Sequence, residues 1–191
     1  MKHGQLRSQM VNPFQILGIK PRLVLSDEDL RGVLREAGKQ AHPDAGGENG
    51  AFVAVREAFA VVSSPSQRLR AWLEWRGSPG EFRGSIDDAL MDLFVELAAV
   101  TQKAEAVIRQ RDESKSALGR ALLEGDTQIC RETVEAAIAK VESVIGGECA
   151  AFADFENAQP LEIAVASQVA RNLAFLEKWR LGLRACFSRL V

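Results

Sequence analysis

A histidine, a proline and an aspartate stand together at His42-Pro43-Asp44, and they are the residues of this chain best suited to act on a partner. Proline disfavours helical backbone in the residue before it, so a helix that runs through Ala41 is expected to stop at His42. The imidazole and the carboxylate then lie on a loop between two helices, and functional side chains are common on loops.

A basic stripe leads into this loop. Arg31, Arg35 and Lys39 recur every four residues, a spacing that places them on one face of a helix. The apolar positions of the same segment form a neighbouring stripe at Leu30, Leu34, Ala37 and Ala41. A basic stripe alone is typical of a solvated helix face, but its position directly before His42 favours a docking role.

Further helices are expected on both sides of the tripeptide. Asn12 and Pro13 predict the start of a first short helix, and Ser26 predicts the N-cap of the basic helix. A third helix is predicted over residues 48–62 by apolar side chains at three- and four-residue spacing: Phe52, Val55, Phe59 and Val62. A fourth, shorter one is predicted over residues 66–76. The second and third helices should pack antiparallel as a helical hairpin, because their connecting loop is short.

Glycines and prolines over residues 77–84 predict a linker that separates a first domain, 12–76, from a second, 85–191. The second domain is rich in alanine and reads as three long helices with short connections, which favours a three-helix bundle. Ser85 is expected to cap the first of these helices in a capping box. No segment shows the alternation of a strand, so the predicted fold class is all-α.

The remaining helices of the second domain are less sharply bounded. One is predicted from Asp126 to about Phe155, interrupted or ended near the glycine pair Gly146-Gly147. The last is predicted to start at Pro160.

Composition excludes several classes of function. The 191 residues carry a net charge of −2, which argues against a nucleic-acid partner. No apolar run is long enough to span a membrane and the first ten residues lack a signal-peptide core, so a cytoplasmic protein is expected. Three widely spaced cysteines and two histidines predict no metal site and no disulfide framework. With no acid–base cluster and no glycine-rich phosphate loop, neither a cofactor nor an enzymatic activity is expected.

The first domain resembles a J-domain. The resemblance covers residues 12–76 and rests on the Phe-x-Ile-Leu-Gly start at Phe14, the basic second helix, the His42-Pro43-Asp44 loop, the Phe52/Phe59 helix and the Gln67-Arg68 pair. It implies a co-chaperone that stimulates the ATPase of an HscA/DnaK-class chaperone. Arg31, Arg35 and Lys39 would pair with an acidic surface of that partner, and His42 and Asp44 would hydrogen-bond to it. The family often has a basic residue after the aspartate, where this chain has Ala45-Gly46-Gly47.

The chain as a whole resembles the HscB (Hsc-type) co-chaperones of iron–sulfur cluster assembly, through its J-domain-like half, the closing Arg76-Gly77, Leu90-Met91-Asp92-x-Phe94 and the run from Leu173 to Lys178. The resemblance implies that the apolar side chains of Leu90, Met91, Phe94 and Phe175 bind an IscU-type cluster scaffold protein. Acidic contacts of that family are replaced here by Val95 and Ala98.

Other interpretations of these residues stay open. A three-helix bundle that buries a wider face would account for the extra apolar side chains around Met91 and Phe94 without any partner. The bundle would then belong to a J-protein with a different client, or to a helical adaptor whose J-like domain stimulates no ATPase.

Overall fold

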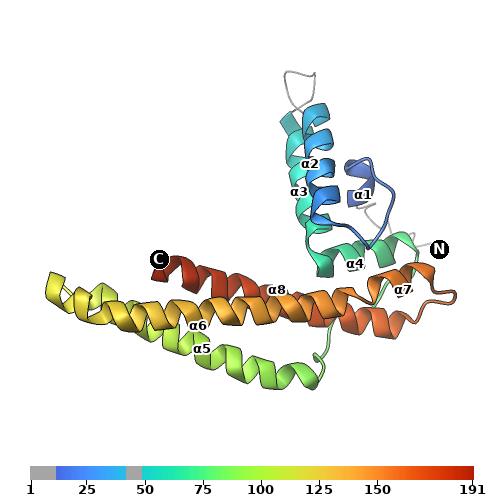
Figure 1. Cartoon of the computed structure of the whole chain (residues 1–191). Coiled ribbons are helices and arrows are strands. Elements are labelled where there is room, and N and C mark those ends of the chain that lie inside the picture. Colours follow the sequence, from blue (N-terminus) through green and yellow to red (C-terminus); the bar gives the residue numbers. More distant parts are fainter. Residues whose placement is uncertain (1–11, 42–48) are drawn as a thin grey trace, which may run out of the picture. The chain divides into compact units, whose positions relative to one another are not determined.

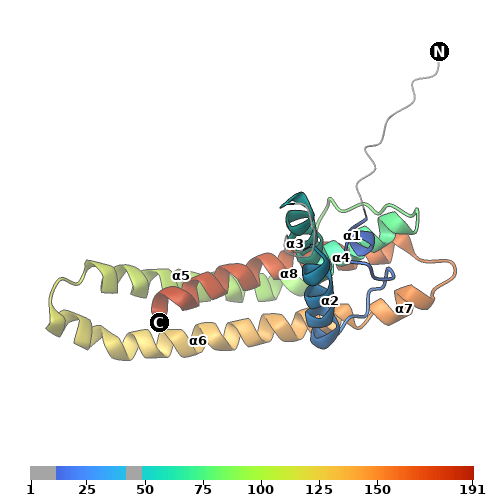
Figure 2. The same cartoon turned by 90° about the horizontal axis from the view of Figure 1, so that it is seen from above.

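The computed structural model describes residues 12–41 and 49–191, and within these ranges every regular element is a helix (Figures 1 and 2). The all-α prediction is therefore confirmed. The chain divides into two compact units, residues 1–80 and 81–191, and the division falls inside the segment 77–84. No helix in the described ranges is long and apolar enough to cross a membrane.

In its described residues, the first unit contains four helices: α1 (Pro13–Ile16), α2 (Asp27–Ala41), α3 (Asn49–Ser63) and α4 (Pro65–Trp75). Helix α1 begins as predicted, because the Asn12 side chain accepts a hydrogen bond from the Phe14 amide at 2.9 Å and Pro13 occupies the first helical position. Helices α2 and α3 lie side by side as a hairpin. The predicted element order of this unit is thus correct.

Helix α2 starts in a reciprocal cap. The Asp29 amide donates to Ser26 Oγ at 3.1 Å, and the Ser26 amide donates back to Asp29 Oδ2 at 2.9 Å. The bond from the Ser26 amide, and a second that Ser26 Oγ donates to the same oxygen at 2.8 Å, lower the pKa of the Asp29 carboxyl. Arg22 pairs with this carboxylate at 2.9 Å and lowers its pKa further. The predicted N-cap is confirmed, with aspartate taking the role that glutamate usually fills in a capping box.

The core of the first unit contains fewer of the expected apolar side chains than the sequence pattern predicts. Its buried apolar side chains are Phe14, Leu17, Leu23, Ala37, Val55, Ala58, Val62, Leu69, Trp72 and Leu73. Leu34 and Phe52, both expected in the apolar stripes, are 39% and 40% exposed. Helix α2 instead faces the core with Leu30, Val33 and Ala37. Val33 thus takes the place that the predicted stripe gave to Leu34.

The second unit is built on α5 (Ala89–Glu113), α6 (Ala117–Cys149) and α8 (Ile163–Leu190), with the short α7 (Phe152–Asn157) between the last two. The three long helices form a bundle in which α8 packs most extensively against α6. The side chains that are fully or almost fully buried on α8 include Leu173, Leu176, Leu183 and Leu190. The predicted bundle is therefore confirmed.

Several predicted boundaries in this unit are wrong. Helix α6 begins at Ala117 rather than near Asp126, because Ser116 Oγ caps it by accepting from the Gly119 amide at 2.9 Å. Helix α8 begins at Ile163 rather than at Pro160. Ser85 forms no capping box, and α5 starts only at Ala89.

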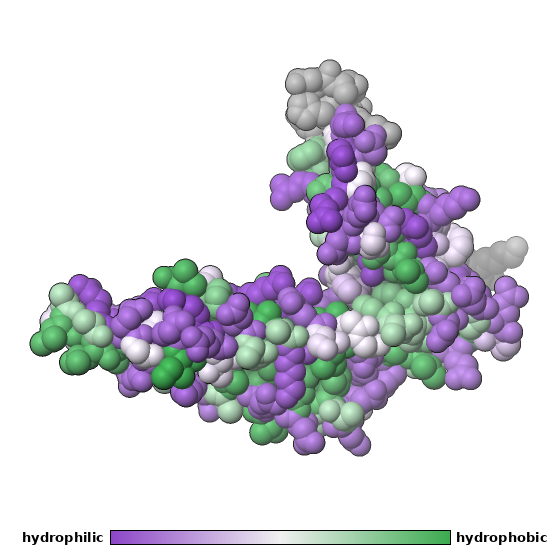
Figure 3. Space-filling model, viewed as in Figure 1, coloured by the Kyte–Doolittle hydropathy of each residue, from purple (hydrophilic) through white to green (hydrophobic). Residues whose placement is uncertain are grey.

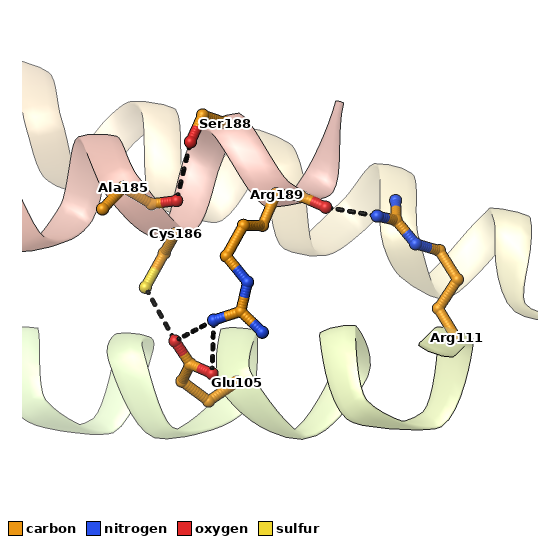
Figure 4. Close-up of polar contacts among 6 residues, drawn as sticks. All are labelled: Glu105, Arg111, Ala185, Cys186, Ser188 and Arg189. Atoms are coloured by element: carbon orange, nitrogen blue, oxygen red, sulfur yellow. Dashed lines mark hydrogen bonds and ion pairs between the residues drawn. The ribbon is translucent and has the colours of Figure 1, made fainter. Parts of the chain in front are cut away.

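The end of α8 is fixed by arginines from the other two long helices. The Arg111 guanidinium donates to the carbonyls of Arg189 and Leu190, and Arg131 Nη2 donates to the Leu190 carbonyl at 2.6 Å. Figure 4 shows the bond between Arg111 and Arg189. These cations satisfy carbonyls that a helix leaves without intrahelical partners. Close by, the Arg189 guanidinium pairs with Glu105 at 2.9 Å and so ties α8 to α5 (Figure 4).

The three cysteines are free thiols. Cys130 and Cys186 are buried, and burial is the main cause of the raised pKa of each thiol. The Glu105 carboxylate, which accepts a hydrogen bond from Cys186 Sγ at 3.5 Å, raises the pKa of Cys186 further (Figure 4). Cys130 and Cys186 thus act as small side chains of the core.

A polar junction joins the other end of the bundle. Asn172 of α8, only 1% exposed, donates through Nδ2 to Asp87 Oδ2 at 2.8 Å and to the Glu148 carboxylate of α6 at 3.2 Å. Burial raises the pKa of the Glu148 carboxyl, the Asn172 hydrogen bond opposes this, and the charge of Asp87 adds to the rise. The folded state therefore favours a neutral group at position 148.

We expect Glu148→Gln to stabilise the second unit at pH 7 and to flatten its pH dependence. Because the pKa of Glu148 is higher in the folded than in the unfolded chain, the folded state binds the proton more tightly, and wild-type stability should fall as pH rises from 4.5 through the raised pKa. Urea unfolding of both proteins between pH 4 and 8 would measure this. The prediction is contradicted if the free energy of unfolding of the wild type rises through that range, or if Glu148→Gln has the same pH dependence as the wild type.

Candidate functional site

The tripeptide His42-Pro43-Asp44 lies outside the described residues. The structure does describe the helices that precede and follow it: α2 extends to Ala41 and α3 begins at Asn49.

The basic face of α2, formed by Arg31, Arg35 and Lys39, is exposed along its whole length. Lys39 pairs with Glu36 at 3.1 Å, but both side chains are 66% exposed, so this ion pair contributes little to stability. Within the described ranges neither Arg31 nor Arg35 forms an ion pair. In Figure 3 the side chains over α2 are mostly hydrophilic. The face therefore exposes two guanidinium groups to solvent.

The second candidate site is an aromatic cluster between α5 and α8, formed by Phe94, Phe175 and Trp179. The Phe94 ring centroid lies 5.8 Å from that of Phe175 and 5.2 Å from that of Trp179, the latter pair edge to face. The Phe175 and Trp179 centroids are 6.2 Å apart. All three side chains are half-buried, so each ring contacts its neighbours and keeps part of its surface free.

Exposed apolar residues extend this cluster along α5. Met91 is 48% exposed and Val95 is 65% exposed, and they stand one turn apart beside Phe94. Leu90 is only 6% exposed and belongs to the core, so its side chain is not part of this surface. The surface offered to a partner thus comprises Met91, Phe94, Val95, Phe175 and Trp179.

Trp179 was missing from the residues selected by sequence. The signal for it is its spacing: it follows Phe175 by four residues and therefore lies on the same face of α8. An indole ring beside two phenylalanines and a methionine is the kind of composition that is enriched at protein interfaces.

Metal chemistry has no support in the described ranges, where no group of three or more histidine, cysteine, aspartate or glutamate side chains is arranged to hold an ion.

No protein-family model matches the chain. Among curated proteins, it is similar to DnaJ homolog subfamily C member 18 of Bos taurus, Macaca fascicularis and Homo sapiens. Each of these relatives is 42% identical over 62 residues, which is 31% of this chain and 17% of the relative. The similarity indicates a J-domain relationship. It gives no support to the HscB type in particular.

The aromatic cluster should be measurable as a coupling in stability. We expect Phe94→Leu and Trp179→Leu to couple by about 0.5–1.5 kcal/mol in a double-mutant cycle, the range for edge-to-face ring pairs beyond their area burial. Chemical unfolding of the four proteins gives this number. A matched cycle of Phe94→Leu with Leu181→Ala, whose side chain is 72% exposed on the same helix, should show no coupling. Equal couplings in the two cycles would contradict the cluster.

Proposed function

We propose that this protein is a J-domain co-chaperone that stimulates the ATPase of an HscA/DnaK-class chaperone. One observation carries the proposal: His42-Pro43-Asp44 falls between the two helices of the α2–α3 hairpin, in a chain similar to DnaJ homologues. The protein is proposed to act by binding and to catalyse no hydrolysis itself.

The proposed mechanism assigns separate roles to the helix and to the loop. The exposed cations of α2, Arg31 and Arg35 above all, attract an acidic surface of the ATPase and speed the encounter. His42 and Asp44 then hydrogen-bond to that partner, while Pro43 restricts the backbone between them. Stimulation follows if these contacts are stronger in the hydrolysis-competent state of the ATPase than in its resting state.

The second unit is proposed to bind a client through Met91, Phe94 and Phe175, with Leu90 supporting them from the core. The first candidate client is an IscU-type iron–sulfur cluster scaffold, on the strength of the HscB-like residues around these positions. The half-buried aromatic rings and the exposed methionine support a protein-binding role for this face.

A second candidate is a J-protein with another client. The observation that favours it is Val95, which is 65% exposed at a position where the HscB type has an acidic contact. An exposed valine there suits a more apolar partner surface than a carboxylate would.

The chaperone assignment is tested by ATP turnover. We expect the wild-type protein to raise the steady-state ATPase rate of a DnaK-class chaperone several-fold and His42→Gln to remove the effect, since the amide cannot reproduce the imidazole contacts. His3→Gln, a control at the other histidine, should act like the wild type. Equal chaperone rates with and without the wild-type protein would leave the adaptor interpretation.

The client assignment is tested by binding to an IscU-type scaffold. We expect the wild type to bind it and a Met91/Phe94/Phe175→Ala variant to lose about tenfold or more in affinity, since truncating one interface hot spot costs over about 1 kcal/mol. A matched variant, Leu118/Leu122/Ile129→Ala, removes three exposed apolar side chains of α6 and should bind normally. If the wild type does not bind, the scaffold is not the client.

A further inference from the structure

Three side chains on one face of α8 hold the chain that leads into α5. Arg171 Nη1 donates to the Glu81 carbonyl at 2.6 Å, and Arg171 Nε donates to the Ser85 carbonyl at 3.3 Å. Gln168 Nε2 donates to the same Ser85 carbonyl at 3.2 Å. We call Gln168, Arg171 and Asn172 the α8 strap. No local capping box forms at Ser85, and the N-cap residue of α5, Asp88, makes no side-chain cap bond.

Asn172 is the central member of the strap, and its amide group is saturated. Its Oδ1 accepts from the Asp87 amide at 3.2 Å and from Gln168 Nε2 at 3.1 Å. Its Nδ2 donates to the carboxylates of Asp87 and Glu148, which uses both of its hydrogens. One buried side chain thereby joins the approach to α5, the end of α6 and α8.

The strap adjoins the aromatic cluster on both helices. On α8, Asn172 precedes Phe175 by three residues and Arg171 precedes it by four. Asp87 lies two residues before the start of α5 at Ala89, and its carbonyl accepts from the Leu90 amide at 2.9 Å. The bonds between Asn172 and Asp87 therefore set how far along α8 the first turns of α5 lie.

We propose that Asn172 is a positioning residue of the client-binding surface: it fixes the register of α5 against α8 so that Met91 and Phe94 meet Phe175 and Trp179. This inference rests on the client-binding role proposed above for that surface. Asn172 is itself buried and contacts no client.

The chemistry of the junction supports a role in geometry rather than in stability. Apolar packing would join three helices at lower cost, because a buried carboxylate must be removed from water. Glu148 remains at this place although burial disfavours its charge. A hydrogen-bonded network requires one specific alignment of its members, whereas apolar side chains tolerate sliding. By thermodynamic linkage, a client that binds only the aligned surface must also stabilise that alignment of α5 and α8.

The test reverses donors and acceptors in the junction. Asn172→Asp places three carboxylates next to one another and should open the junction. The triple variant Asp87→Asn/Glu148→Gln/Asn172→Asp surrounds one carboxylate with two amides and should close the junction again. Asn157→Asp on α7, which is exposed, is the matched control. Asp87→Ala is a milder variant at an exposed position, in case Asn172→Asp does not fold.

Amide hydrogen exchange over residues 89–95 is the first measurement, and it needs no client. We expect exchange there to accelerate about tenfold or more in Asn172→Asp or Asp87→Ala and to return to the wild-type rate in the triple variant, with α6 unaffected around Val134. Unchanged exchange in the single variants, or no recovery in the triple variant, overturns the proposal.

Affinity for the IscU-type scaffold is the second measurement. We expect it to fall in Asn172→Asp and Asp87→Ala and to return to the wild-type value in the triple variant. A normal affinity in Asn172→Asp, despite faster exchange, also overturns the proposal. If the wild type does not bind the scaffold, the client assignment fails. The exchange rates of residues 89–95 in the variants then still show whether Asn172 sets the register of α5.

Discussion

The second unit depends on one apolar seam, the packing of α8 against α6. Leu173, Leu176, Leu183 and Leu190 of α8 are fully buried, and Val134 and Val141 of α6 are equally inaccessible. Burying such side chains is worth about 1.5–3 kcal/mol each, so this seam fixes the rotation of α8 about its axis. Once that rotation is fixed, Phe175 and Trp179 lie at the edge that faces α5. The aromatic cluster is therefore a consequence of where the seam lies.

The contact between α5 and α8 is of a different kind. It is held by polar ties at its two ends, the Asn172 bonds to Asp87 at one end and the Arg189–Glu105 pair at the other, with the aromatic cluster between them. Polar ties demand a definite geometry and add little net stability. Between the two ties, the rings of Phe94, Phe175 and Trp179 stay half-buried. That combination leaves the rings of Phe94 and Phe175 both ordered and accessible.

Features that depend on neighbouring residues were predictable from the sequence, and features that depend on distant ones were not. The caps at Asn12 and Ser26 were correct because their bonds reach two and three residues along the chain. The box predicted at Ser85 does not form: α5 starts only at Ala89, and the chain at Ser85 is held by bonds from Gln168 and Arg171, more than 80 residues away. Periodicity likewise locates an apolar stripe on a helix but does not show how many of its residues are buried. It placed the exposed Leu34 and Phe52 in the core and did not identify Trp179 as part of a surface. The aromatic cluster becomes visible only when α5 and α8 are placed together.

The two candidate surfaces also differ in the physics of recognition, and the difference fits the proposed roles of ATPase docking and client binding. Exposed cations such as Arg31 and Arg35 act at long range and mainly raise association rates, which screening by salt weakens. Apolar contacts such as those offered by Phe94 and Trp179 act at short range and mainly set dissociation rates. A co-chaperone must hold its client long enough to meet the ATPase and then leave that ATPase quickly. In the proposed function, an apolar client surface on one unit and a charged docking face on the other would meet both requirements without either surface compromising the other.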